Sequence, residues 1–139
     1  MVVVNASVVA VGLRKKSGAL RELPIRLFVM DTGAQVVRCL REERIDTVIS
    51  RWELVDMPNG MLLQKIKAAK PAIPTIAFIR SGDHKQEAIA RSLGVSAVLN
   101  EDIGDEHFRE VVCQLLGIYR VIGIKATDVY GVRMELKAD

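Results

Sequence analysis

The sequence predicts an α/β domain built on a doubly wound, five-stranded parallel sheet. The chain has 139 residues, which is enough for one domain with a sizeable core. Half of the residues are hydrophobic but only 4% are aromatic, so the core must consist mainly of Val, Ile, Leu and Ala. Short, almost entirely apolar runs alternate with longer amphipathic segments along most of the chain. Strands buried on both faces have this composition, and their alternation with helices implies a parallel sheet covered on both sides.

The first strand is expected in the β-branched run 2–4. Asn5, Ala6 and Ser7 would then cap a helix, because apolar residues recur at near-helical spacing as far as Leu23. The remaining strands are expected over 25–30, 46–50, 74–79 and 96–100, and the remaining helices over 34–44, 61–70, 84–94 and 105–119.

Chemistry in a doubly wound sheet gathers at the carboxyl ends of the strands, where the following loops meet. The loop over 51–60 lies at the carboxyl end of the expected third strand, and it carries Pro58 and Gly60. With these strand boundaries, the residues at this edge are Asn5, Ala6, Asp31, Ser50, Arg51, residues 79–81, Asn100 and Glu101.

Charge and cysteine content argue against several functional classes. The formal net charge is +3, and its densest cluster, Arg-Lys-Lys at 14–16, has no interleaved aromatic residues for base stacking. This favours a solvated helix face over a nucleic-acid patch. Cys39 and Cys113 are far apart in expected helices, which is typical of reduced thiols in a cytoplasmic protein. The apolar opening 1–12 is too short to span a membrane.

Three segments carry a resemblance to a known family: "DTGAQVVRCLREERIDTVIS", "WELVDMPNGMLLQKIKAAKPAIPTIAFI" and "ARSLGVSAVLNED". From about residue 2 to 119 the chain resembles the receiver domain of bacterial two-component response regulators, the CheY-like family. The resemblance implies a flavodoxin-like sheet. In receivers the third strand ends in an aspartate that accepts a phosphoryl group, followed by a loop with Met-Pro and a glycine. The stretch "VDMPNG", with Pro58 and Gly60, is similar.

The functional residues of the family do not carry over. In receivers two acids after the first strand hold magnesium, and the matching positions are Asn5 and Ala6. Arg51 takes the place of the phosphoacceptor and cannot act as a nucleophile. The hydroxyl residue that ends the fourth strand is matched by Ile79, or by Arg80 if the register slips by one residue.

The lysine of the fifth strand is matched by Glu101. The resemblance therefore implies a degenerate phosphorylation pocket. It points to a pseudo-receiver that binds other proteins without phosphorylation, is not an enzyme and needs no metal or cofactor. We hypothesise that Arg51 and Glu101 form a charge-swapped, bidentate ion pair in the pocket. In the alternative, both side chains extend into water. Trp52 is expected to pack over the loop.

Another alternative is an atypical response regulator that is still phosphorylated, or binds a ligand, at Asp31, Ser50 or Asp56. Capping of loops is the more typical role for both aspartates, and Ser50 has no nearby histidine in sequence. His84 and His107 have no spaced Cys or His partners, so a metal site is not expected.

Residues 120–139 lie beyond the resemblance. They contain two short alternating patterns around Thr127-Asp128, which indicates a hairpin. An isolated hairpin is marginal in water, so this tail must pack on the domain, add to a sheet edge or pair with another copy. In receivers, the fourth helix, fifth strand and fifth helix form the usual partner surface. We therefore expect a homodimer through His84 to Tyr119 and the tail.

Overall fold

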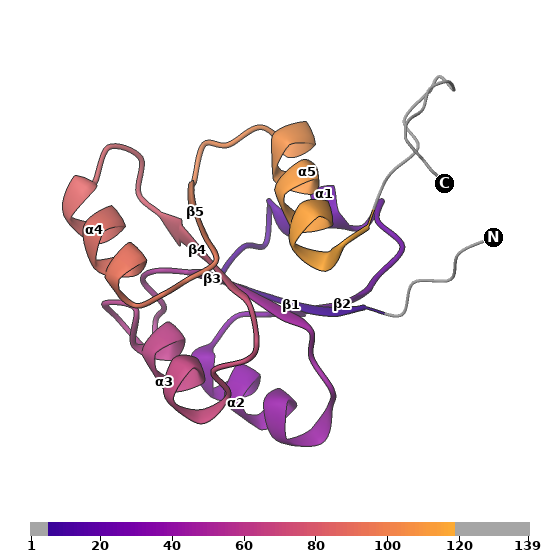
Figure 1. The fold of residues 1–139 in the computed structure, drawn as a ribbon, viewed down its shortest axis with the longest axis horizontal. Helices are drawn as coiled ribbons and strands as arrows, with labels where there is room; N and C mark the ends of the chain where they lie inside the picture. The colour runs from indigo at the N-terminus through magenta and orange to yellow at the C-terminus, as the bar shows by residue number, and fades with distance from the viewer. Residues whose placement is uncertain (1–5, 119–139) are drawn as a thin grey trace.

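The structure, a computed structural model, describes residues 6–118 of the chain. Five parallel strands form one sheet in the order β2-β1-β3-β4-β5, with helices on both faces (Figure 1). The strands are β1 (Ser7–Val11), β2 (Arg26–Met30), β3 (Thr47–Arg51), β4 (Thr75–Ile79) and β5 (Ala97–Asn100). The helices are α1 (Ser17–Leu20), α2 (Gly33–Glu42), α3 (Met61–Ala69), α4 (His84–Ser92) and α5 (Asp105–Leu116). The predicted doubly wound parallel sheet is confirmed.

The helix predicted to follow residues 5–7 and to reach Leu23 was wrong. Residues 8–11 belong to β1 instead of the start of a helix, and their side chains are completely buried. Four consecutive small or β-branched apolar residues suit a central strand that is covered on both faces. Gly12, with φ +74°, ends this strand, and the helix that follows has only four residues. The expected strand 2–4 lies outside the described residues.

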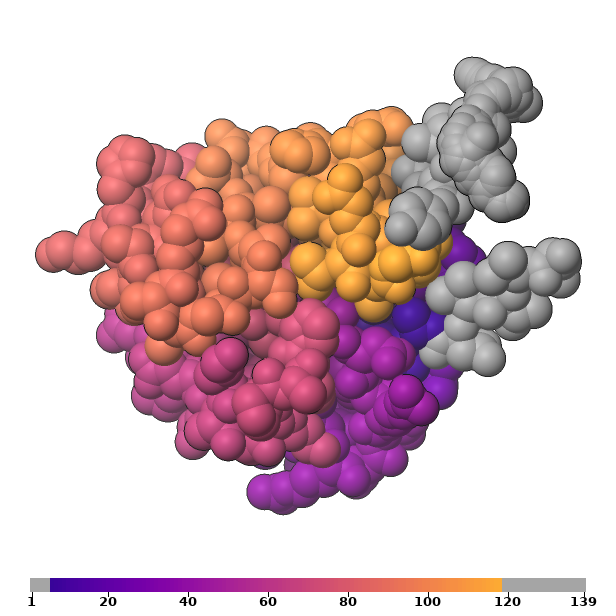
Figure 2. Space-filling view, viewed as in Figure 1, coloured from indigo at the N-terminus to yellow at the C-terminus, as the bar shows by residue number. Residues whose placement is uncertain are grey.

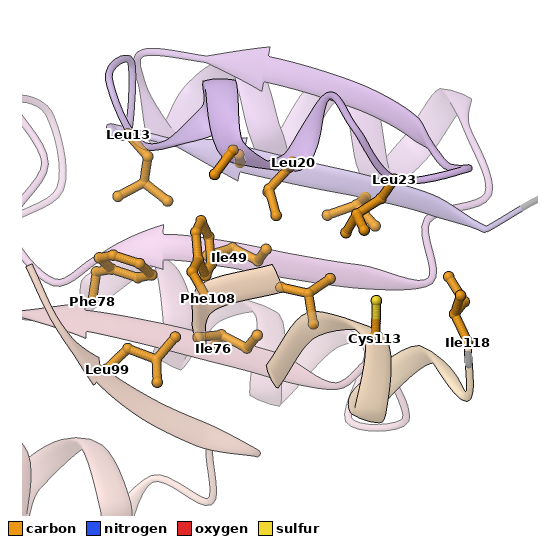
Figure 3. Close-up of a cluster of buried hydrophobic side chains, with 14 residues drawn as sticks. Leu13, Leu20, Leu23, Ile49, Ile76, Phe78, Leu99, Phe108, Cys113 and Ile118 are labelled. Atoms are coloured by element: carbon orange, nitrogen blue, oxygen red, sulfur yellow. The ribbon is translucent and has the colours of Figure 1, made fainter. Parts of the chain in front are cut away.

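The two faces of the sheet have separate cores. Helices α1 and α5 cover one face, where a cluster joins Leu20, Phe108 and Cys113 to the central strands (Figure 3). Helices α2, α3 and α4 cover the other face, and Cys39 is buried there. Phe108 of α5 meets Phe78 of β4 edge to face, with ring centroids 5.0 Å apart. These contacts hold α5 on the sheet.

The elements of the C-terminal part of the domain lie next to one another at the surface. Helix α4, strand β5 and helix α5 occupy neighbouring parts of one face of the molecule, coloured from red-orange to orange in Figure 2. The expected hairpin at 120–139 and the end of the last predicted helix, Tyr119, lie outside the described residues. No helix in the described part of the chain is both long and apolar enough to cross a membrane.

Candidate functional site

The candidate site is the carboxyl edge of the sheet, where the loops after β1, β3, β4 and β5 meet. Of the residues predicted to lie there, Arg51 ends β3, Ile79 ends β4, Arg80 follows it, and Glu101 follows β5. Ile79 is 1% exposed and packs in the core under α3 and α4, whereas Arg80 is exposed. Neither Ile79 nor Arg80 carries a hydroxyl group, and the first hydroxyl after β4 belongs to the exposed Ser81.

Ala6 was placed at the wrong edge. Because β1 begins at Ser7, Ala6 lies at the amino edge of the sheet, where its carbonyl accepts a hydrogen bond from the Arg26 amide at 2.8 Å. Asn5 lies outside the described residues. Gly12 and Leu13 are the residues that follow β1 at the carboxyl edge, and neither carries a carboxylate.

Arg51 and Glu101 form the predicted ion pair. Arg51 Nε donates to Glu101 Oε2 at 2.7 Å, with the two side chains 49% and 35% exposed. The contact is a single hydrogen bond instead of the bidentate pair expected. The Glu101 amide also donates to the carbonyl of Ile79 at 3.0 Å. The loops after β3 and β5 are thus joined to each other across the end of β4.

The space next to the end of β1 is occupied by Arg51 and Leu54. A Cβ atom built on Gly12 would lie 2.8 Å from Leu54 Cδ2 and 3.1 Å from Arg51 Cβ. Both distances are shorter than normal carbon contacts, so a side chain at position 12 has no room. Gly12 was not among the residues predicted at this edge, although a glycine that ends an apolar run is a signal for close backbone approach.

Two more ion pairs connect the loops at this edge. Arg14, after β1, donates from Nε and Nη2 to the two carboxylate oxygens of Asp31, at 2.9 and 2.7 Å. This hydrogen bonding holds the pKa of Asp31 below its ordinary value. Lys16 donates to the Ile103 carbonyl and lies 3.2 Å from an oxygen of Asp105. The carboxylate of Asp31 therefore pairs with an arginine of another loop, instead of capping its own loop as expected.

Asp56 caps helix α2. Its Oδ1 accepts from the Gly33 amide at 2.9 Å and its Oδ2 from the Ala34 amide at 3.0 Å. These backbone hydrogen bonds lower the pKa of Asp56, because they stabilise the charged carboxylate. Capping was expected within loops, whereas Asp56 caps a distant helix and so attaches the loop after β3 to the start of α2.

Trp52 and Ser50 face the protein interior. Trp52 is 3% exposed and its ring lies against Gly60, where an added Cβ would come within 2.3 Å of the ring. It packs over the loop as predicted. Ser50 is completely buried, and its hydroxyl donates to the Arg51 carbonyl at 2.8 Å. Phosphorylation of Ser50 would require this strand end to open.

The described residues also lack a donor set for a metal. No group of three or more His, Cys, Asp or Glu side chains within 6–118 is placed to hold an ion. At the candidate site, the carboxylates of Asp31 and Glu101 are each paired with an arginine.

Comparison with known proteins identifies the fold. Neither a family model nor a curated protein matches the chain. Among solved structures, the signal receiver domain of an HD domain-containing protein from Pseudomonas fluorescens Pf-5 is 23% identical with a TM-score of 0.74, and the match covers 82% of this chain and 96% of that one. A response regulator receiver protein from Burkholderia phymatum is 26% identical with a TM-score of 0.70, over 82% and 97% of the two chains.

NtrX from Brucella abortus is 14% identical with a TM-score of 0.75, and the match covers 82% of this chain but 27% of NtrX. The chain is thus similar to whole receiver domains and to about a quarter of a larger protein. These likenesses show that residues 6–118 have the flavodoxin-like fold of response regulator receiver domains.

The Arg51–Glu101 pair is expected to contribute modestly to stability. In a double-mutant cycle with Arg51→Ala and Glu101→Ala, the coupling free energy should be about 0.2–1 kcal/mol, because both side chains are partly exposed. Added salt should reduce it. Urea unfolding of the four proteins at low and high salt measures both effects. A coupling free energy of zero at low salt would show that the two side chains do not interact.

The Asp56 cap is expected to make stability depend on pH. Because the folded-state pKa of Asp56 is lowered, its stabilising effect is complete above its unfolded pKa, about 4, and is lost as the pH falls through the folded value. The difference in unfolding free energy between the unmodified protein and Asp56→Ala should therefore be largest at neutral pH and should shrink below about pH 4. Urea titrations from pH 7 to pH 2.5 measure it.

Asp56→Asn provides the control for charge. It keeps one oxygen acceptor but no titrating group, so its difference from Asp56→Ala should stay constant with pH. The cap hypothesis would be wrong if the difference between the unmodified protein and Asp56→Ala were also constant.

Proposed function

We propose that this domain is a phosphorylation-independent, receiver-like signalling module that acts by binding another protein. The main support for this proposal is that Arg51 and Leu54 fill the space beside Gly12, at the end of β1. Phosphoryl transfer to a receiver needs a free carboxylate nucleophile and a divalent cation with carboxylate ligands. At this edge an arginine ends β3, and the first residues after β1 carry no acid.

The charge pattern supports a fixed conformation at the same edge. Arg51 pairs with Glu101 and Arg14 pairs with Asp31, so the loops are connected without any ligand. In this proposal the ion pair replaces the phosphoryl-dependent contact between β3 and β5, and the domain presents one binding surface constitutively. It has no catalytic residues and requires no cofactor, and the buried cysteines are compatible with a reducing, cytoplasmic environment.

The proposed partner surface is formed by α4, β5 and α5. These elements occupy one continuous part of the surface (Figure 2). Ile89 on α4 is 44% exposed and lies at the side of α4 that faces α3, where it lines a hollow with Trp52 and Gln64. A second copy of the chain is the partner we propose, which would make the protein a homodimer through this region.

Incubation of the full chain with acetyl phosphate and Mg²⁺ tests independence from phosphorylation. Intact mass spectrometry should detect no phosphorylated protein, and Mg²⁺ should not change the fluorescence of Trp52. A receiver domain with a complete acidic site, treated in parallel, confirms that the phosphodonor is active. Incorporation of phosphate would overturn the proposal, and its loss in Asp31→Asn, Ser50→Ala or Asp56→Asn would locate the atypical site.

Sedimentation of Ile89→Asp tests the partner surface separately. If α4 lies in a homodimer interface, this variant should be monomeric at concentrations where the unmodified chain is dimeric. Val55→Asp is a matched control, because Val55 is an apolar residue that is 98% exposed and lies in the loop after β3, outside the proposed surface. A monomeric unmodified chain, or a dimer that Ile89→Asp does not affect, would contradict the homodimer.

A further inference from the structure

Strand β2 has a free edge. It is the outermost strand of the sheet and pairs only with β1 among the described strands. The Arg26 amide donates to the carbonyl of Ala6, just before β1, and the Met30 carbonyl accepts from the amide of Gly12, just after β1. In a parallel strand, backbone groups of alternate residues point to opposite sides. The amides and carbonyls of Leu27 and Val29 therefore point away from β1, toward the free edge.

The same strand is incompletely covered on the face of α1 and α5. Helix α1 is a single turn, and Val29 is 37% exposed. Leu27 and Ile25, which lie on the same face as Val29, are only partly buried. An apolar edge strand without a covering element is a site for pairing with another strand, and proteins normally protect such edges.

The chain leaves α5 close to the beginning of this edge. Leu115 and Leu116, at the end of α5, line a surface hollow together with Ser7 and Arg26, the first residues of β1 and β2. Ile118 is 8% exposed and belongs to the core cluster on this face. The described part of the chain therefore ends near the amino end of β2.

A connection from α5 to a strand beyond β2 would also be right-handed, which is the favoured handedness. Helix α1 links β1 to β2, and so crosses toward this edge of the sheet, over the face that it shares with α5. The proposed connection would run from β5 through α5 to a new strand beyond β2 that is parallel to β2. It would cross the sheet in the same direction as α1, and over the same face. Connections between parallel strands are right-handed in nearly all proteins, and both of these share that hand.

We propose that residues 121–126 add to β2 as a sixth, parallel strand of the same molecule. The segment reads Val-Ile-Gly-Ile-Lys-Ala, and six residues are enough to pair along the five residues of β2. Its alternation places Ile122, Ile124 and Ala126 on one side, and these would cover Val29. Its backbone would pair with Leu27 and Val29. This interaction is independent of the proposed function.

Amide hydrogen exchange in the full chain, followed by NMR, tests the proposal. In the unmodified protein the amides of Leu27 and Val29 should exchange at least about tenfold more slowly than in Ile124→Pro, since proline prevents the added strand from pairing. The amide of Phe28, which points toward β1, should be equally protected in both and verifies that the sheet is intact. Ala138→Pro, outside the proposed strand, should behave like the unmodified chain.

Equal, fast exchange of Leu27 and Val29 in the unmodified chain and Ile124→Pro would overturn the proposal. In the unmodified chain alone, nuclear Overhauser contacts should join Leu27 and Val29 to residues 121–126. A sample that mixes labelled and unlabelled chains distinguishes the source of the strand. Contacts seen only between different molecules would show that a second copy supplies it, and would also overturn the proposal.

Discussion

Phe108→Ala is expected to lower the free energy of unfolding by about 3–5 kcal/mol. Phe108 is completely buried, and its ring packs at 71° to that of Phe78, with the centroids 5.0 Å apart. It is the largest fully buried side chain of α5 and contacts the core formed with α1 and the sheet (Figure 3). Its removal would leave a cavity between a helix and a sheet, which cannot close without moving the helix.

Urea unfolding followed by circular dichroism measures this effect. Phe108→Leu should cost much less than Phe108→Ala, because it keeps most of the buried volume. His107→Ala, at an exposed position on the same helix, should change the unfolding free energy by less than about 0.5 kcal/mol. Similar losses for Phe108→Ala and His107→Ala would mean that α5 is not packed on the sheet as described.

The sequence predicted most of the fold because the last four strands are short apolar runs with clear breaks. Pro71 and Gly94 stand just after α3 and α4, and the predicted boundaries of β3 to β5 differ from the structure by one residue. The prediction for residues 8–23 was wrong for a physical reason. Val8, Val9 and Leu13 recur at a near-helical spacing. Residues 8–11 are nevertheless completely buried between two layers of helices, which is the environment of a central strand.

The candidate site was only partly predictable. The Arg51–Glu101 contact could be proposed from the resemblance to receivers, in which an aspartate of the third strand faces a lysine of the fifth, because here the two charges are exchanged. The role of Gly12 could not be proposed, because it depends on where β1 begins and on its approach to Leu54. Sequence spacing gives neither of these. The capping of α2 by Asp56 likewise joins residues 22 and 23 positions apart.

Gly12→Asp is expected to lower the free energy of unfolding by about 2–4 kcal/mol. The substitution introduces a carboxylate directly after β1, at the edge where receivers hold their acids. Two costs add. Gly12 has φ +74°, which is unfavourable for any other residue, although aspartate tolerates it better than most. The new Cβ would also lie 2.8 Å from Leu54 Cδ2 and 3.1 Å from Arg51 Cβ.

Gly82→Asp separates the two costs. Gly82 has φ +79°, but an added Cβ there meets nothing within 4 Å, so only the backbone cost of about 1 kcal/mol remains. The extra loss at Gly12, about 1–3 kcal/mol, measures how tightly Arg51 and Leu54 fill the space. That extra loss should decrease when Gly12→Asp is made in a Leu54→Ala background, because the nearest atom is then absent.

These unfolding measurements bear directly on function. If Gly12→Asp costs no more than Gly82→Asp, the end of β1 has room for an acidic side chain, and the observation that carries the proposed function is wrong. If the extra loss is found, an acid cannot be introduced at this position without also removing Leu54 or Arg51. A phosphoacceptor site at this edge would then require changes at several contacting residues, because the apolar stem of Arg51 and the side chain of Leu54 occupy the volume that an acid after β1 would need.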